Sequence, residues 1–115
     1  MAEKVVKEYY SDGKLAVVKS FKNGKKHGLF VGYRSNGTIA SVNQYENGLE
    51  VNWSKFYFPN GKVASRTHYR NGKIDGPHLI YYENGKIRLH EYFEQGVSKF
   101  KYCYDLKGNI DHTIC

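Results

Sequence analysis

Proline is scarce in this chain, with only 2 among 115 residues, so little in the sequence interrupts the hydrogen-bonded ladders of a sheet. Long apolar runs are absent as well, and no segment reaches the length of a membrane-spanning helix. The first residues, from Met1 to Lys7, lack the apolar core of a secretion signal. We therefore expect a cytoplasmic protein.

Cysteine is equally rare, since Cys103 and Cys115 are the only two. Their spacing matches neither a metal knuckle nor a redox pair, and two cysteines make no disulfide framework. We expect two reduced thiols, and a bond that closes the C-terminal loop is the alternative.

Arrangements that support catalysis are missing too. Serine, aspartate and histidine are scattered without a nucleophile–base spacing, and the glycines belong to turns rather than to a phosphate-binding loop. His68 and His78 flank one turn and could approach each other across the ladder, with Asp75 nearby, but a third metal ligand is lacking. We expect a non-enzymatic protein with no catalytic residue, no metal site and no cofactor.

Glycine and aromatic residues are abundant instead, with 12 Gly, 11 Tyr and 6 Phe. Most of the glycines fall in two series of turns that repeat every 24 residues. The first turn series is Asn23-Gly24, Asn47-Gly48, Asn71-Gly72 and Gln95-Gly96. The second turn series is Asp12-Gly13, Asn36-Gly37, Asn60-Gly61, Asn84-Gly85 and, after a step of 23, Lys107-Gly108. Asn-Gly and Asp-Gly favour type I′ hairpin turns, because these residues tolerate positive φ.

Two turns in every 24 residues predict a run of β-hairpins. We interpret the second series as short turns and the first as the middle of longer connections, such as residues 22–28. Four full units and a truncated fifth predict an all-β fold, a single-layer curled antiparallel meander of nine or ten strands. At ~4.8 Å between strands this sheet spans roughly 45 Å, and its curl would bring one aromatic face partly onto itself. Residues 1–115 are expected to form a single domain.

The repeat carries a recognisable motif. It reads Tyr-Tyr-x-Asn-Gly-Lys-apolar at residues 81–87 and Tyr-x-Asn-Gly-Lys-x-x-Gly at residues 69–76. In this pattern, over about residues 8–110, the chain resembles the MORN-repeat variant family of bacterial proteins. The final Gly of the motif stands at Gly28 and Gly76, whereas Asn52 and Phe100 replace it in the other units. The resemblance implies a protein-binding or membrane-associated scaffold of antitoxin-like type, and it implies no active-site residue.

Aromatic residues are the best candidates for contact with a partner. Tyr33, Tyr57 and Tyr81 form a column that is either a recognition stripe or the packing rung of the repeat.

The strand that carries Trp53, Phe56 and Phe58 breaks the repeat, because the preceding unit has Leu, Gly and Arg at these positions. We expect these three aromatic side chains to contact a partner, and the alternative is that they fill a local packing defect.

The net charge of +7 arises mainly near the N-terminus, since residues 1–34 hold 8 Lys or Arg against 3 Asp or Glu. The candidates for contact with an anion are Lys19, Lys22, Lys25 and Lys26. Around the first turn series the charges change sign from unit to unit, and nucleic-acid binding needs a continuous basic track.

These observations favour a module that binds another protein. The resemblance implies a bacterial or phage origin and a neutralising role, as in an antitoxin or inhibitor. The first alternative is electrostatic binding of nucleic acid or anionic lipid through the N-terminal lysines. The second is a scaffold that self-associates through its edge strands, because open edges pair.

Overall fold

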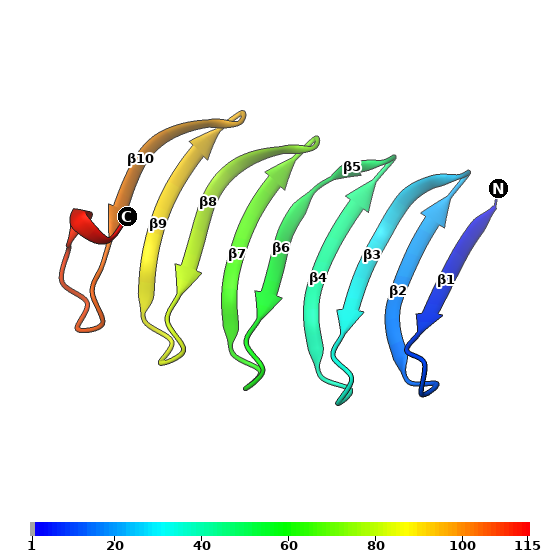
Figure 1. Cartoon of the computed structure of the whole chain (residues 1–115). Coiled ribbons are helices and arrows are strands. Elements are labelled where there is room, and N and C mark those ends of the chain that lie inside the picture. Colours follow the sequence, from blue (N-terminus) through cyan, green and yellow to red (C-terminus); the bar gives the residue numbers. More distant parts are fainter. Residues whose placement is uncertain (1) are drawn as a thin grey trace.

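The computed structural model describes residues 2–115. All ten strands belong to one antiparallel sheet, in which each strand pairs with its neighbours in the sequence and the short β5 pairs only with β4 (Figure 1). The strands are β1 Glu3–Tyr9, β2 Leu15–Lys22, β3 Lys25–Tyr33, β4 Ile39–Glu46, β5 Leu49–Glu50, β6 Asn52–Tyr57, β7 Val63–Arg70, β8 Lys73–Tyr81, β9 Ile87–Glu94 and β10 Val97–Cys103. A single 3-10 turn, η1 His112–Ile114, follows the last strand. The predicted fold class is confirmed.

The first turn series is tighter than expected. Asn23 and Gly24 both have positive φ, 51° and 77°, and the residues on either side of them, Lys22 and Lys25, already pair across the ladder. This is the two-residue hairpin that Asn-Gly favours. The expected longer connection over residues 22–28 is therefore wrong, because β3 begins directly after the turn.

The second turn series, in contrast, forms the longer loops. In the first of them Gly13 N–H donates to the Tyr10 carbonyl (2.9 Å) and Tyr10 N–H donates to the Lys14 carbonyl (2.8 Å). Asp12 lacks positive φ, and its carboxylate accepts from the Lys14 N–H at 3.0 Å. The expectation of type I′ turns is therefore wrong for this series, because the Asn or Asp side chain closes the loop and only the glycine is left-handed.

A bulge bends the strands that follow the first turn series. One residue of β2 lies opposite three residues of β3. Gly28 is one of these three and has φ of 102°. Gly76 in β8 has φ of 111°, and Asn52, the first residue of β6, takes this position with φ of 59°. In β10 the bulge contains one extra residue, Lys99. The last unit is one residue shorter than the others, and the residue it lacks is one of the bulge residues. The bulge in β10 therefore does not require a glycine.

Hydrogen bonds tie neighbouring units together at both ends of the strands. Beside the first turn series, the Gly48 N–H donates to the Lys26 carbonyl, and the same bond recurs at Gly72 and Gly96, each at 2.8 Å. Beside the second series, side chains reach the backbone carbonyl of the following unit. These bonds are Tyr10 to Tyr33, Arg34 to Tyr57 and Tyr82 to Tyr104.

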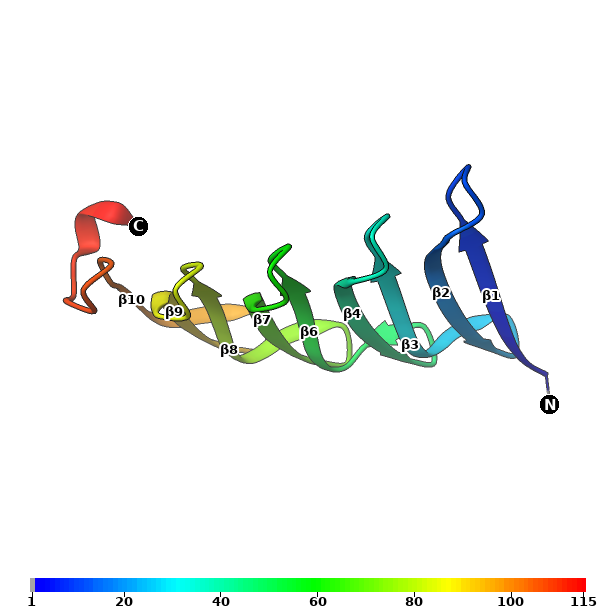
Figure 2. The same cartoon turned by 90° about the horizontal axis from the view of Figure 1, so that it is seen from below.

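The molecule is a thin, bowed plate with extents of 48 × 35 × 15 Å. Within residues 2–115 no helix or second sheet covers either face (Figure 2). The only apolar side chains that are almost fully buried in this part of the chain are Leu79 and Cys103, at 6% and 1% exposure. The predicted width is confirmed, while the sheet stays open along both edges.

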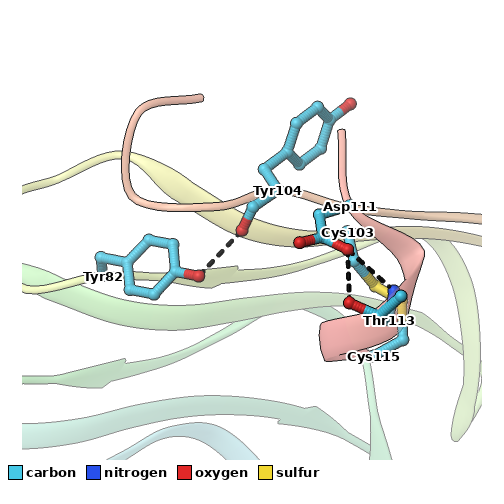
Figure 3. Close-up of a disulfide and its surroundings, with 6 residues drawn as sticks. All are labelled: Tyr82, Cys103, Tyr104, Asp111, Thr113 and Cys115. Carbon is cyan, nitrogen blue, oxygen red and sulfur yellow. Dashed lines mark hydrogen bonds between the residues drawn. A yellow bond between two sulfur atoms is a disulfide. The ribbon is translucent and has the colours of Figure 1, made fainter. Parts of the chain in front are cut away.

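Residues 104–115 fold back against β10. Tyr104 forms a bridge with Ile110, and the Asp111 N–H donates to the Cys103 carbonyl at 2.8 Å. Cys115 is thereby brought to Cys103 and forms a disulfide with it, the Cα atoms lying 5.8 Å apart (Figure 3). The expectation of two reduced thiols is wrong here, and the alternative of a closed C-terminal loop holds.

Candidate functional site

The strand register assigns each side chain to one of two faces, because successive residues of a strand point to opposite sides. One face, called here the tyrosine face, carries Tyr33, Tyr57 and Tyr81 near the second turn series. A row of directly paired residues crosses this face through the whole sheet. It comprises Lys7, Val18, Val31, Val42, Lys55, Arg66, Leu79, His90 and Tyr102.

The opposite face, called here the polar-row face, carries a hydrogen-bonded row at its centre. Asn43 Nδ2 donates to Ser54 Oγ at 2.7 Å, and Thr67 Oγ1 lies 2.7 Å from His78 Nδ1. Ser54 and Thr67 are buried, at 4% and 9% exposure. Burial lowers the pKa of His78 below its usual value, and the carboxylate of Glu91 opposes this shift. This row is internally satisfied and offers few free groups to a partner.

The tyrosine face holds the most organised cluster of polar and aromatic side chains. The Arg66 guanidinium carbon lies 4.7 Å from the centre of the Trp53 ring, and Arg66 Nε donates to the Tyr81 hydroxyl at 2.9 Å. The His68 ring meets Trp53 edge-on at 5.0 Å. Three neighbouring strands, β6, β7 and β8, therefore fix the guanidinium in place, with cation–π attraction adding to the hydrogen bond.

Beside this cluster lies a hollow of about 440 Å³, called here the basic hollow. It is lined by Lys55, Gly61, Lys62, Val63, Arg66, Tyr81 and Gly85. Among these described residues none is acidic, and three are cationic. An Arg fixed beside two Lys suits a carboxylate, because the guanidinium offers paired N–H donors in one plane. The basic hollow is the candidate functional site.

The three repeat-breaking aromatics do not form one surface. Trp53 pairs with His68 on the tyrosine face, whereas Phe56 pairs with Ser65 on the polar-row face and is 51% exposed. Phe58 lies beyond the end of β6, in the loop of the second turn series. Trp53 and Phe56 lie on different faces because an odd spacing in a strand turns two side chains to opposite sides. Contact of each of the three residues with a partner stays a prediction.

The tyrosine column is present on one face as predicted. Tyr33, Tyr57 and Tyr81 end their strands at equivalent positions and are half-buried. Tyr81 alone among these three contributes to the basic hollow. The role of the column in binding stays a prediction.

The N-terminal lysines are divided between the faces. Lys19 pairs with Glu8 at 3.0 Å, and the Lys26 ammonium lies 4.8 Å from the centre of the Tyr45 ring, both on the polar-row face. Lys22 and Lys25 lie opposite each other in the strand ladder, and their side chains are on the tyrosine face. The four side chains therefore form no continuous basic patch.

The two histidines named as possible metal ligands are also separated. His68 lies on the tyrosine face, where its Nδ1 donates to the Asp75 carbonyl at 2.8 Å, and His78 lies on the polar-row face. Their approach across the ladder does not occur. A different group of metal-ligating residues, Cys103, His112 and Cys115, comes together at the C-terminus, with ligand atoms all within 4.8 Å of one another.

Reasoning from the sequence overlooked Arg66, Lys55 and Lys62. A signal existed for Arg66, because the 24-residue period places Val18, Val42 and His90 at the equivalent positions of the other units, and none of these is an arginine. Its neighbours Trp53 and Tyr81 are 13 and 15 residues away in sequence. They meet Arg66 only through the register of three strands.

Comparison with known proteins bears on the fold. The family model described as "MORN repeat variant" matches residues 2–23, 54–71 and 74–95, which is just over half of the chain. A solved structure described as accessory secretory protein 1, 2 and 3 in Streptococcus pneumoniae is similar over 80% of this chain, with 19% sequence identity and a TM-score of 0.46. The present chain spans 17% of the length of that chain. No curated protein matches the sequence. Within residues 2–115, no helix is long and apolar enough to cross a membrane.

Proposed function

The chain belongs to the MORN repeat variant family, and from this premise we propose that it is a non-enzymatic module that binds and neutralises another protein, as an antitoxin or inhibitor does. MORN repeats are generally modules that bind proteins or membranes. Because no layer of the described residues covers the plate, its tyrosine face is available to a partner.

The observation that carries the proposal is the Arg66 guanidinium, held between the Trp53 ring and the Tyr81 hydroxyl at the edge of the basic hollow. Fixing an arginine in advance reduces the conformational entropy that is lost on binding. Trp, Tyr and Arg are also the residues that contribute most to protein–protein binding energy. The partner we propose presents a carboxylate-bearing segment to this hollow.

Electrostatic binding of nucleic acid or lipid has less support. The four N-terminal lysines point to two faces, and two of them already contact Glu8 or aromatic rings. A nucleic-acid backbone needs a row of free cations on one side.

The test is a capture experiment on cell extract of the source organism, with the wild-type chain and three variants as baits. The partner captured by the wild type is identified and then titrated in purified form. We expect Arg66→Ala and Trp53→Ala to weaken binding by about tenfold or more, since each removes a central side chain of the site. Phe56→Ala, an exposed aromatic on the polar-row face of the same strand, is the matched control and should bind normally.

Equal binding by Arg66→Ala and wild type, or a loss confined to Phe56→Ala, would exclude the basic hollow as the contact. Binding of nucleic acid that falls steeply with added salt and disappears on reversing Lys22 and Lys25 would favour the electrostatic alternative instead.

A further inference from the structure

The C-terminal segment, residues 103–115, forms a closed clip that the repeat does not explain. Cys103 ends β10 and is 1% exposed, while His112 and Cys115 belong to the exposed η1 turn and its cap. The Sγ atoms of the two cysteines and a ring nitrogen of His112 all lie within 4.8 Å of one another. Two sulfurs and one imidazole nitrogen are the donors that zinc prefers.

We propose that, once the disulfide is reduced, the clip binds one Zn²⁺ ion through Cys103, His112 and Cys115. Tetrahedral zinc with bonds of about 2.3 Å to sulfur and 2.0–2.1 Å to nitrogen sets its ligand atoms roughly 3.6–3.8 Å apart. The three ligand atoms lie up to 4.8 Å apart in the structure, and small side-chain rotations bring them to these distances. A water molecule or a partner's side chain completes the fourth position.

The clip is held by bonds that do not depend on the disulfide. The Asp111 N–H donates to the Cys103 carbonyl, Tyr104 bridges to Ile110, and the Asp105 N–H donates to the Asn109 carbonyl at 2.8 Å. The Tyr82 hydroxyl, in the loop after β8, donates to the Tyr104 carbonyl at 2.8 Å (Figure 3).

Asp111 also fixes the local shape of η1. Its carboxylate accepts from both the backbone N–H and the hydroxyl of Thr113 (Figure 3). The Tyr102 ring lies 6.0 Å from the His112 ring. The three ligands therefore stay close to one another when the S–S bond is broken, which limits the entropy lost on binding a metal.

The change from the disulfide form of the clip to the zinc-bound form is chemically balanced. Two equivalents of a small-molecule thiol, or one dithiol, reduce the Cys103–Cys115 bond to two thiols and are themselves oxidised to a disulfide. The two thiols then bind Zn²⁺ as thiolates and release two protons. In a reducing cytoplasm, where we expect this protein to act, thiol reductants open disulfides. Zinc would there close the clip that a disulfide closes under oxidising conditions.

The experiment compares oxidised and reduced full-length chain. A phosphine reductant, later removed without air, gives the reduced form; its phosphorus takes up oxygen from water as the disulfide becomes two thiols. We expect equilibrium dialysis to show one Zn²⁺ per reduced chain and none per oxidised chain. Co²⁺ in place of zinc should give the charge-transfer absorption of cobalt–thiolate bonds and the visible bands of a tetrahedral ion.

Variants distinguish a built site from chance binding. Cys115→Ser should abolish the cobalt–thiolate spectrum of a two-sulfur site, and His112→Ala should weaken zinc binding by at least about tenfold. His27→Ala, at the other end of the sheet, is the matched control and should bind like wild type. Circular dichroism verifies that each variant keeps its sheet. Absence of zinc binding by the reduced chain, or binding unchanged in both His112→Ala and Cys115→Ser, would overturn the proposal.

Discussion

Asn52 occupies a backbone position that other units reserve for glycine. Its φ of 59° is left-handed, as are those of Gly28 and Gly76 at equivalent places. Asn tolerates this conformation better than other side chains, and an ordinary residue loses about 1–2 kcal/mol there. We expect Asn52→Ala to lower the free energy of unfolding by about 1 kcal/mol and Asn52→Gly to leave it within about 0.5 kcal/mol. Urea denaturation measures both, and equal stability of the two variants would contradict the assignment.

His78 gives the sheet a pH dependence of defined sign. Its folded-state pKa is lowered because burial disfavours the charged ring, with the nearby carboxylate of Glu91 opposing this. The unfolded chain therefore binds the proton more tightly. The stabilisation from neutral His78 is complete above the unfolded pKa of about 6.5 and is lost as the pH falls from there through the folded value.

The test follows urea midpoints between neutral pH and about pH 5. We expect the wild type to lose stability over this interval, and His78→Gln to lose less of it, because glutamine does not titrate. His90→Gln on the tyrosine face serves as the control and should behave like wild type. An unchanged pH profile in His78→Gln would show that other groups cause the effect.

At the scale of elements, Phe58 stands where the equivalent residues of other units form a hydrogen bond to the next unit. Tyr10, Arg34 and Tyr82 each donate a side-chain hydrogen bond to a carbonyl of the next unit. Phe58 occupies the same place in its loop, because its N–H donates to the Lys62 carbonyl at 2.7 Å as Tyr82 does to Lys86 at 2.8 Å. Phenylalanine has no hydroxyl to continue the series.

Phe58→Tyr should therefore raise the free energy of unfolding by about 0.5–1.5 kcal/mol, the usual net value of one hydrogen bond. Tyr82→Phe should lower it by a similar amount, since it leaves the Tyr104 carbonyl without this partner. Thermal and urea unfolding should show changes of opposite sign in the stability of the two variants if this hydrogen bond joins neighbouring units. Destabilisation by Phe58→Tyr would mean that the added hydroxyl does not reach its acceptor.

The elements also show where prediction from sequence succeeds and where it stops. A strict 24-residue period predicts the strands, their order and the sheet width, because each hairpin pairs only with its neighbours. The period does not tell which Asn-Gly or Asp-Gly pair forms the tight turn and which forms the longer loop. Asn23 takes positive φ itself, whereas Asp12 closes a wider loop through its carboxylate. The choice depends on how many residues the flanking strands leave unpaired.

The candidate site was less accessible to prediction. Trp53 was identified because it interrupts the repeat, but its partner Arg66 was not. The face that each side chain takes follows from the ladder register, which bulges shift at each unit. The bond between Cys103 and Cys115 was an alternative from the sequence, but the approach of His112 to them was not predicted, because no spacing rule covers a cysteine on a strand that meets a His and a Cys on a following turn.

At the scale of the whole molecule, the plate departs from a compact domain. The Cα radius of gyration is 16.4 Å, whereas a compact domain of this length has about 13 Å. X-ray scattering of the monomer should therefore give a radius near 16–17 Å, allowing for a thin hydration layer. A value near 13 Å would show that the sheet closes in solution. A mass twice that of the chain would favour pairing through the edge strands β1 and β10.

The hydrogen bonds that join each first-series turn to the next have a consequence for how such proteins change over generations. In the part of the chain that the structure describes, each unit pairs only with the units next to it, and the same bond from a Gly N–H recurs between them at Gly48, Gly72 and Gly96. Duplication of a gene segment that encodes 24 residues would add two strands and widen the plate by about 10 Å, without a new kind of contact. An insertion of odd length in a regular part of a strand would turn the later side chains to the wrong face unless a bulge absorbed it, as the bulge at Lys99 in β10 absorbs the residue missing there. Copying whole units is thus the route by which this architecture can grow.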